Sequence, residues 1–238
     1  MKQYAVIGAS SFGKRVLDEL ILIDCEIILI DKDPDLIDYY KNDVTVSYVA
    51  NVLNETTLKK LIPQDIDAVV VDLGDKIETS ILVTQYLKKI GIPQIIVKAE
   101  TEEHGEILEI IGAHQVVFPN LEAAKRVTPQ LVSDLLFNYL PISGGLVLAE
   151  TGVMEEFSGK SLMELNFRKD YGINVVAFRR SGQGDYQFVT PEYRLSSSDV
   201  LLVVGREEDV SVFTKKENIS NSKKIGQLFR LWFNRKAT

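Results

Sequence analysis

Six short apolar segments alternate with helical patterns in the first half of the sequence. They lie between Gln3 and about Phe118 and read YAVIG, EIILID, TVSYVA, DAVVVDL, QIIVKA and QVVFP. Each is rich in β-branched residues and nearly continuously apolar, which is typical of parallel strands covered on both faces. Stretches with helical periodicity, such as FGKRVLDELILI and KIETSILVTQYLKKIG, separate them. This alternation predicts an α/β fold with a Rossmann-like, doubly wound parallel sheet.

The pattern changes after this region. Residues 121–140, LEAAKRVTPQLVSDLLFNYL, predict a long helix with a kink or break near Thr128 and Pro129. The segment PISGG follows, and then the patterns LVLAETGV, SLMEL, GINVVAFRR, YQFVTP and DVLLVVG predict a second, smaller α+β domain. We therefore expect a first domain over 1–120, a connecting helix over 121–140, a second domain over 141–214 and a separate tail over 215–238.

Composition and charge limit the kinds of function that this chain can have. Its net charge is −7, but residues 215–238 hold seven Lys or Arg and one Glu, a charge of +6, which leaves −13 for residues 1–214. This negative charge on residues 1–214 argues against a nucleic-acid-binding surface there. No apolar run approaches the ~18 residues of a membrane span, and no signal peptide is evident. With a single cysteine, Cys25, the chain is expected in the cytoplasm.

The segment YAVIGASSFGKRV predicts a strand, a turn that opens on Gly8 and a helix that starts near Phe12. A dinucleotide fingerprint G-x-G-x-x-G belongs at this place, because unpaired N–H groups at a helix N-terminus bind phosphate. Gly8 permits the tight turn, and Gly13 allows the helix to pack closely on the strand. The middle glycine is replaced by Ser10, whose hydroxyl could donate to a phosphate oxygen.

Asp31 ends the second apolar segment, 18 residues after Gly13. This is near the spacing expected for a carboxylate that binds ribose hydroxyls, and it disfavours a 2′-phosphate, so NAD or an adenine nucleotide is expected rather than NADP. The alternative is that Asp31 caps the helix that begins near Pro34. The two histidines, His104 and His114, and Cys25 show no metal-ligand spacing, so no metal site is expected.

Taken in order, these motifs resemble the regulatory subunits of Trk/Ktr-type potassium uptake systems, which are built from RCK domains. The resemblance covers residues 3 to about 213. The matching segments are YAVIGASSFG, LID, ANVLNETTL, VVVDLGD, SILVTQYLKKIGIPQIIVKA, HGEILEIIGAHQVVFP, GKSLMELNFRKDYGINVVAFRRSG and DVLLVVG.

The resemblance implies a nucleotide-sensing RCK N-terminal domain followed by an RCK C-terminal domain. It also implies a homodimer, commonly within an octameric ring, that lies in the cytoplasm at the inner face of the cell membrane. There the ring would regulate a membrane potassium-translocating subunit, without chemistry on the nucleotide. The competing interpretation is an NAD-dependent oxidoreductase on the same fold, which would need a proton donor or acceptor near the nicotinamide.

The family pattern also implies binding residues. A nucleotide (ATP, ADP, AMP or NAD(H)) would contact the turn through Gly8, Ser10, Ser11, Phe12 and Gly13. Asp31 and Lys32 would lie at its ribose, and Asn51 and Val52 near its adenine. The far side of the site would be lined by Leu73, Gly74 and Lys98. Some relatives bind cyclic di-AMP in the C-terminal domain, and the matching positions are Arg168, Ile173 and Asn174. The alternative there is a solvated arginine beside a turn asparagine.

Three departures from the family pattern leave the nucleotide open. Ser11 and Asn120 stand where Ktr-type members often have Arg and Glu, so discrimination between ATP and ADP is in doubt. Asp72 stands where a small residue is usual, and it could disfavour a γ-phosphate or hold a cation.

The tail has an amphipathic, cationic pattern. Ile225, Leu228, Phe229 and Trp232 recur at helical spacing among lysines and arginines. A helix of this kind could contact an anionic membrane surface or the transporter. Packing on a dimer partner, or disorder, are the alternatives.

Overall fold

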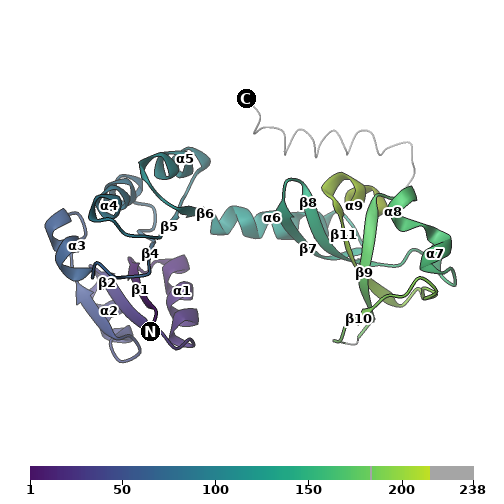
Figure 1. Ribbon diagram of the computed structural model, residues 1–238, viewed down its shortest axis with the longest axis horizontal. Helices are drawn as coiled ribbons and strands as arrows, with labels where there is room; N and C mark the ends of the chain where they lie inside the picture. The colour runs from purple at the N-terminus through teal and green to yellow at the C-terminus, as the bar shows by residue number, and fades with distance from the viewer. Residues whose placement is uncertain (183, 215–238) are drawn as a thin grey trace. The chain divides into compact units, whose positions relative to one another are not determined.

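A computed structural model describes residues 1–182 and 184–214 of the chain, so the predicted basic tail at 215–238 lies outside the described residues. The chain divides into two compact units, of which the first spans Met1–Asn120 and the second begins at Leu121 (Figure 1). None of the helices in the described part of the chain is long and apolar enough to cross a membrane.

The first unit is a parallel α/β sheet in the strand order β3-β2-β1-β4-β5-β6, which confirms the predicted fold class. The strands are β1 (Gln3–Ile7), β2 (Glu26–Asp31), β3 (Val46–Val49), β4 (Ala68–Val71), β5 (Ile95–Lys98) and β6 (Gln115–Val117). The helices between them are α1 (Ser11–Ile21), α2 (Pro34–Tyr40), α3 (Glu55–Leu61), α4 (Ile77–Ile90) and α5 (Glu102–Ile111). The order reverses between β1 and β4, which is where open α/β sheets bind ligands.

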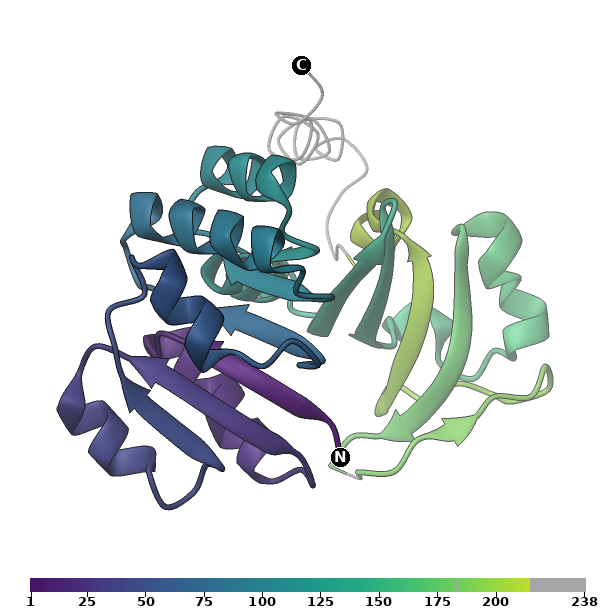
Figure 2. The ribbon, with the colours of Figure 1, turned by 60° about the vertical axis from the view of Figure 1, so that its left-hand side comes forward.

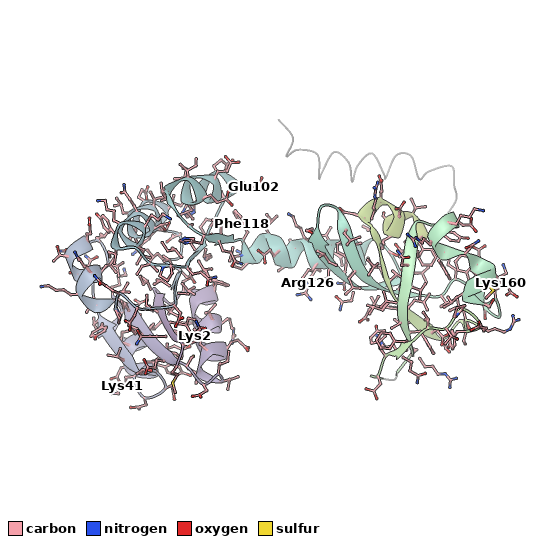
Figure 3. All side chains as sticks on the ribbon, in the orientation of Figure 1. Lys2, Lys41, Glu102, Phe118, Arg126 and Lys160 are labelled. Carbon is pink, nitrogen blue, oxygen red and sulfur yellow. The ribbon has the colours of Figure 1, made fainter. Side chains whose placement is uncertain are left out.

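Helices cover both faces of this sheet because successive residues of a strand point to opposite sides. Val6 and its neighbours on one face pack with Leu17 of α1 and with α2. Ile7 and its neighbours on the other face pack with Leu87 of α4 and with α3 and α5. Side chains fill the space between the sheet and these helices (Figure 3). The near-continuous apolar runs in the sequence are therefore explained by burial on both sides.

The prediction of a long helix over 121–140 is wrong for the second half of this segment. Helix α6 spans Pro119–Leu131, and the chain then forms strand β7 over Leu136–Ser143. The helix ends two residues after Pro129, which cannot donate a hydrogen bond to the preceding turn.

A β-bulge explains why the second half of this segment resembles a helix. Leu136 and Tyr139 are both buried and lie three residues apart, which is a helical spacing. In the structure the pairing of β7 with its neighbour shifts between Leu136 and Asn138, so the extra residue places both side chains on one face of a strand.

The second unit contains an antiparallel sheet in the order β10-β9-β11-β8-β7, visible as the teal-to-yellow strands of Figure 2. Its remaining elements are β8 (Leu146–Gly152), a 3-10 turn (Glu155–Phe157), α7 (Leu162–Leu165), α8 (Phe167–Asp170), β9 (Ile173–Arg180), β10 (Gln187–Phe188), β11 (Asp199–Arg206) and α9 (Glu207–Phe213). Four aromatic rings form the centre of its core, with centroids 5.4–5.9 Å apart for contacting pairs; they are Phe157, Phe167, Tyr171 and Phe213. This is the predicted α+β architecture.

Candidate functional site: the turn between β1 and α1

The turn from Gly8 to Gly13 is tightly packed at both of its glycines. Gly8 has φ +74°, and a Cβ at this position would lie 2.3 Å from the backbone oxygen of Asp72. A Cβ on Gly13 would lie 2.7 Å from the backbone oxygen of Gly8. Ser10 has φ −69°, a value open to any residue. The fingerprint thus keeps glycine where the packing requires it and tolerates serine where the packing does not.

Three backbone N–H groups at the start of α1 are free to bind a ligand. Across the described ranges 1–182 and 184–214, no protein group accepts a hydrogen bond from the amides of Ser10, Ser11 or Phe12. The Ser10 side chain makes no capping hydrogen bond either. Unpaired amides at the positive end of a helix dipole form an anion-binding site. The residues present therefore suit the phosphates of a nucleotide.

Asp31 stabilises this turn by hydrogen bonds. Its Oδ2 accepts a hydrogen bond from Ala9 N at 2.8 Å, and its Oδ1 accepts one from Asp33 N at 2.9 Å. The cap of α2 is Asp33, whose Oδ1 accepts from Asp35 N at 3.0 Å. Asp31 is therefore not the helix cap that the sequence left as an alternative. Each carboxylate oxygen retains a lone pair for a ribose hydroxyl.

The other predicted binding residues of this domain lie at or just beyond the carboxyl ends of strands. Lys32 follows β2, Asn51 and Val52 follow β3, and Leu73 and Gly74 follow β4. Lys98 ends β5. Because the strands are parallel, their carboxyl ends meet at one edge of the sheet, so these residues lie at the same edge as the turn. Asn51 and Lys32 are exposed, whereas Val52 is buried.

Asp72 is a buried carboxylate that fixes the backbone of the site. Its buried carboxylate accepts hydrogen bonds from Gly13 N at 2.7 Å and from Gly74 N at 3.2 Å. Lys98 Nζ lies 3.5 Å from Asp72 Oδ1 and 2.6 Å from Glu100 Oε1, and only 9% of the Lys98 side chain is exposed. Burial opposes the charge on Lys98, but the two carboxylates outweigh it and raise the pKa of the lysine. Asp72 thus occupies one amide of α1 and pairs with a buried cation.

His104 anchors the segment that carries Glu100. Its Nδ1 accepts a hydrogen bond from Glu100 N at 3.2 Å, and its Nε2 lies 2.7 Å from Ser80 Oγ. Ser80 Oγ donates its proton to Ile77 O at 2.8 Å, so the neutral His104 ring donates from Nε2. Both ring nitrogens are used within the protein, and burial lowers the pKa of His104.

This arrangement predicts a loss of stability in acid. Since the folded-state pKa of His104 is below the unfolded value of about 6.5, protonation favours the unfolded chain, and stability is retained above that pH and lost as the pH falls below it. The variant His104→Gln should show a smaller fall in melting temperature between about pH 7.5 and about pH 5 than the unmodified chain does. Equal falls for His104→Gln and the unmodified chain would contradict this role.

A pocket of about 310 Å³ lies in the second unit. All three residues that the family pattern assigned to cyclic di-AMP, Arg168, Ile173 and Asn174, line it. Phe167 and Pro191 add apolar walls. The fold therefore brings these residues to one concave surface with a cation and an amide at its edge.

Two residues close to the candidate site were missed by sequence reasoning. Glu100 pairs with Lys98, and the spacing of two residues along an extended chain could have placed both on the same side. Lys76 lies two residues after Gly74, in the loop that packs on the turn. It was overlooked because it begins the stretch KIETSILVTQYLKKIG, which was assigned to a helix.

Comparison with known families defines the class of protein. The TrkA-N domain model matches residues 4–119, and the TrkA-C domain model matches residues 147–217. The Ktr system potassium uptake protein C of Bacillus subtilis (strain 168) is 33% identical over 215 residues, which are 90% of this chain and 97% of the relative. Protein A of the Ktr system in the same organism is 29% identical over 89% of this chain and 95% of its own length. The chain therefore belongs to the family of Ktr potassium uptake proteins.

Solved structures share the fold. The RCK domain of GsuK superposes with a TM-score of 0.63 at 17% identity, and the GsuK channel bound to NAD does so with a TM-score of 0.64 at 16% identity. Both matches cover 100% of this chain but 54% and 45% of the GsuK chains, so this chain spans about half their length. The sequence-based prediction of an RCK-type protein with a Rossmann-like first domain is confirmed.

Proposed function

We propose that this chain is a cytoplasmic, nucleotide-sensing regulatory subunit of a potassium uptake system. The observation that carries the proposal is the set of three unpaired amides at Ser10, Ser11 and Phe12, next to a carboxylate, Asp31, that retains lone pairs for a ribose. Membership in the Ktr family supports the link to potassium transport. The ligand is an adenine nucleotide (ATP, ADP or AMP) or NAD(H), held by the residues of this edge of the sheet.

Regulation needs only that the nucleotide binds two arrangements of the protein with different affinity. A coupling free energy of about 1–3 kcal/mol is sufficient to shift such an equilibrium. In this proposal the chain performs no chemical step on the nucleotide. It assembles as homodimers within an octameric ring on a membrane potassium-translocating subunit, at the inner face of the membrane. Exposed apolar side chains on β7, namely Phe137 (49% exposed) and Ile142 (54% exposed), support self-association.

The pocket of the second unit is the proposed site for cyclic di-AMP. The Arg168 guanidinium would pair with a phosphate, and the Asn174 amide would bind a base edge. Pro191, which also lines the pocket, supports apolar contact with a base.

A panel of thermal shifts tests both sites. ATP, ADP, AMP, NAD, NADH and cyclic di-AMP are added to the full chain, and a ligand at about 100 times its dissociation constant should stabilise the protein by about 2.7 kcal/mol. Asp31→Ala should abolish the shift for nucleotides and retain the shift for cyclic di-AMP, whereas Arg168→Ala should do the reverse. Each variant is thus the control for the other.

The proposal fails if no nucleotide shifts the melting temperature, or if Asp31→Ala leaves every shift intact. Steady oxidation of NADH, followed by its absorbance in the presence of the purified chain and candidate substrates, would instead support an oxidoreductase.

A further inference from the structure

Asp72 places a carboxylate at the end of α1 that faces the proposed ligand. The residue is 1% exposed, and its Oδ2 accepts a hydrogen bond from Gly13 N at 2.7 Å. The amides of Ser10, Ser11 and Phe12, which donate to no protein group among the described residues, directly precede Gly13 in the sequence. A carboxylate and a ligand phosphate would therefore share the positive end of one helix dipole.

The position of this carboxylate is fixed by its contacts with the turn. Its Oδ1 accepts a hydrogen bond from Gly74 N at 3.2 Å. A Cβ on Gly8 would lie 2.3 Å from the backbone oxygen of Asp72, and a Cβ on Gly13 would lie 3.3 Å from Asp72 Cβ. Asp72 N also donates to Ile7 O at 2.9 Å, which continues the pairing of β1 with β4. The side chain therefore cannot turn away from an anion without breaking these contacts.

Lys98 compensates only part of this charge. Its Nζ lies 3.5 Å from Asp72 Oδ1 but 2.6 Å from Glu100 Oε1, so two carboxylates share one ammonium group. Because only 9% of the Lys98 side chain is exposed, solvent screens this group less than it screens charges on the surface. A phosphate bound at α1 would therefore meet free amides together with a negative charge that the protein does not fully neutralise.

We propose that Asp72 is a specificity-determining residue, which directs this site toward nucleotides whose phosphates are all diesters and away from nucleotides with a terminal phosphate. A phosphate diester carries a single negative charge, whereas a terminal phosphate carries about −1.5 to −2 at pH 7. Repulsion from Asp72 is therefore larger for a terminal phosphate, while the free amides can bind either kind. The ligand class is the pyrophosphate diester of a dinucleotide. This inference rests on the proposed function, because it names the ligand of that same site.

Calorimetric titration of the full chain with ADP-ribose, ADP and ATP, in a buffer without divalent cations, tests the assignment. ADP-ribose and ADP share the adenosine and both phosphates, but only ADP has a terminal phosphate. The unmodified chain should bind ADP-ribose more tightly than ATP. Asp72→Asn removes the charge and nearly preserves the size of the side chain. It should strengthen ATP binding by about tenfold and ADP-ribose binding by no more than about threefold.

Two further variants complete the comparison. Asp65→Asn is the matched control, because Asp65 is exposed and precedes β4 by three residues, at the opposite edge of the same sheet. It should leave all three affinities unchanged. Glu100→Gln removes one charge of the shared group from a side chain that is 28% exposed. It should also strengthen the binding of ATP more than that of ADP-ribose.

Equal changes in the ATP and ADP-ribose affinities of Asp72→Asn overturn the proposal, as does tighter binding of ATP than of ADP-ribose by the unmodified chain. If Asp72→Asn does not fold, Glu100→Gln and the unmodified chain decide by the same two criteria. If the unmodified chain binds none of the three compounds, the proposed function itself fails, which is a different result from binding without discrimination.

Discussion

Replacing Asp72 with alanine should lower the free energy of unfolding by about 2–4 kcal/mol, one of the largest effects expected for this chain. The substitution leaves Lys98, with 9% of its side chain exposed, paired with Glu100 alone. It also removes the acceptor for the N–H groups of Gly13 and Gly74. Removing one partner of a buried ion pair is costly because the remaining charge has lost part of its compensation for desolvation.

Urea unfolding of the full chain, followed by far-ultraviolet circular dichroism, measures this loss. Asp75→Ala is the matched control, because it removes the same charge from an exposed position three residues away and should change stability by no more than about 0.5 kcal/mol. A second result is expected in binding: ADP should bind Asp72→Ala more tightly, since the substitution removes a negative charge at α1 and frees the amide of Gly13. Equal stability of the two variants would contradict the structural role of Asp72.

Gly8→Ala should destabilise the first unit by about 3 kcal/mol or more and abolish nucleotide binding. The backbone of Gly8 has φ +74°, which disfavours any residue with a Cβ. The added methyl group would also lie 2.3 Å from Asp72 O and 2.7 Å from Leu73 Cδ2. Asp72 O belongs to the backbone directly after β4, so this clash is relieved only if the turn moves away from the sheet.

Gly91→Ala separates the cost of a positive φ from the cost of the steric clash. Gly91 has φ +89° at the end of α4, and no atom lies within 4 Å of the position that its Cβ would take. It should therefore cost only about 1 kcal/mol, the conformational part of the penalty. Thermal unfolding of both variants, with and without ADP, provides the comparison. If Gly8→Ala costs no more than Gly91→Ala, or binds ADP normally, the close packing of the turn does not govern the site.

Much of the first unit could be predicted because its signals are local. The segment that forms β4 is apolar at every position, and those that form β1 and β2 are polar only at their ends, at Gln3, Glu26 and Asp31; a strand buried on both faces explains that pattern. Parallel strands then place their carboxyl ends together, so the positions of Gly8, Asp31 and Lys98 at one edge follow from order along the chain. The placement of the site needed no knowledge of side-chain contacts.

Other features depend on partners distant in the sequence. Asp72 and Gly13 are 59 residues apart, and nothing near either residue indicates that a carboxylate accepts a hydrogen bond from that amide. The segment at 136–140 was predicted as a helix because a bulge in the pairing of β7 with β8 gives its buried residues a helical spacing.

The sequence by itself determined the α/β class, the two-part organisation and the edge of the sheet where a nucleotide would bind, because hydrophobic periodicity and glycine positions act within a few residues. Tertiary structure alone decided which amides are free and that Lys98 is paired with Asp72 and Glu100. Those properties depend on distances between side chains from different strands, and only the folded chain sets such distances.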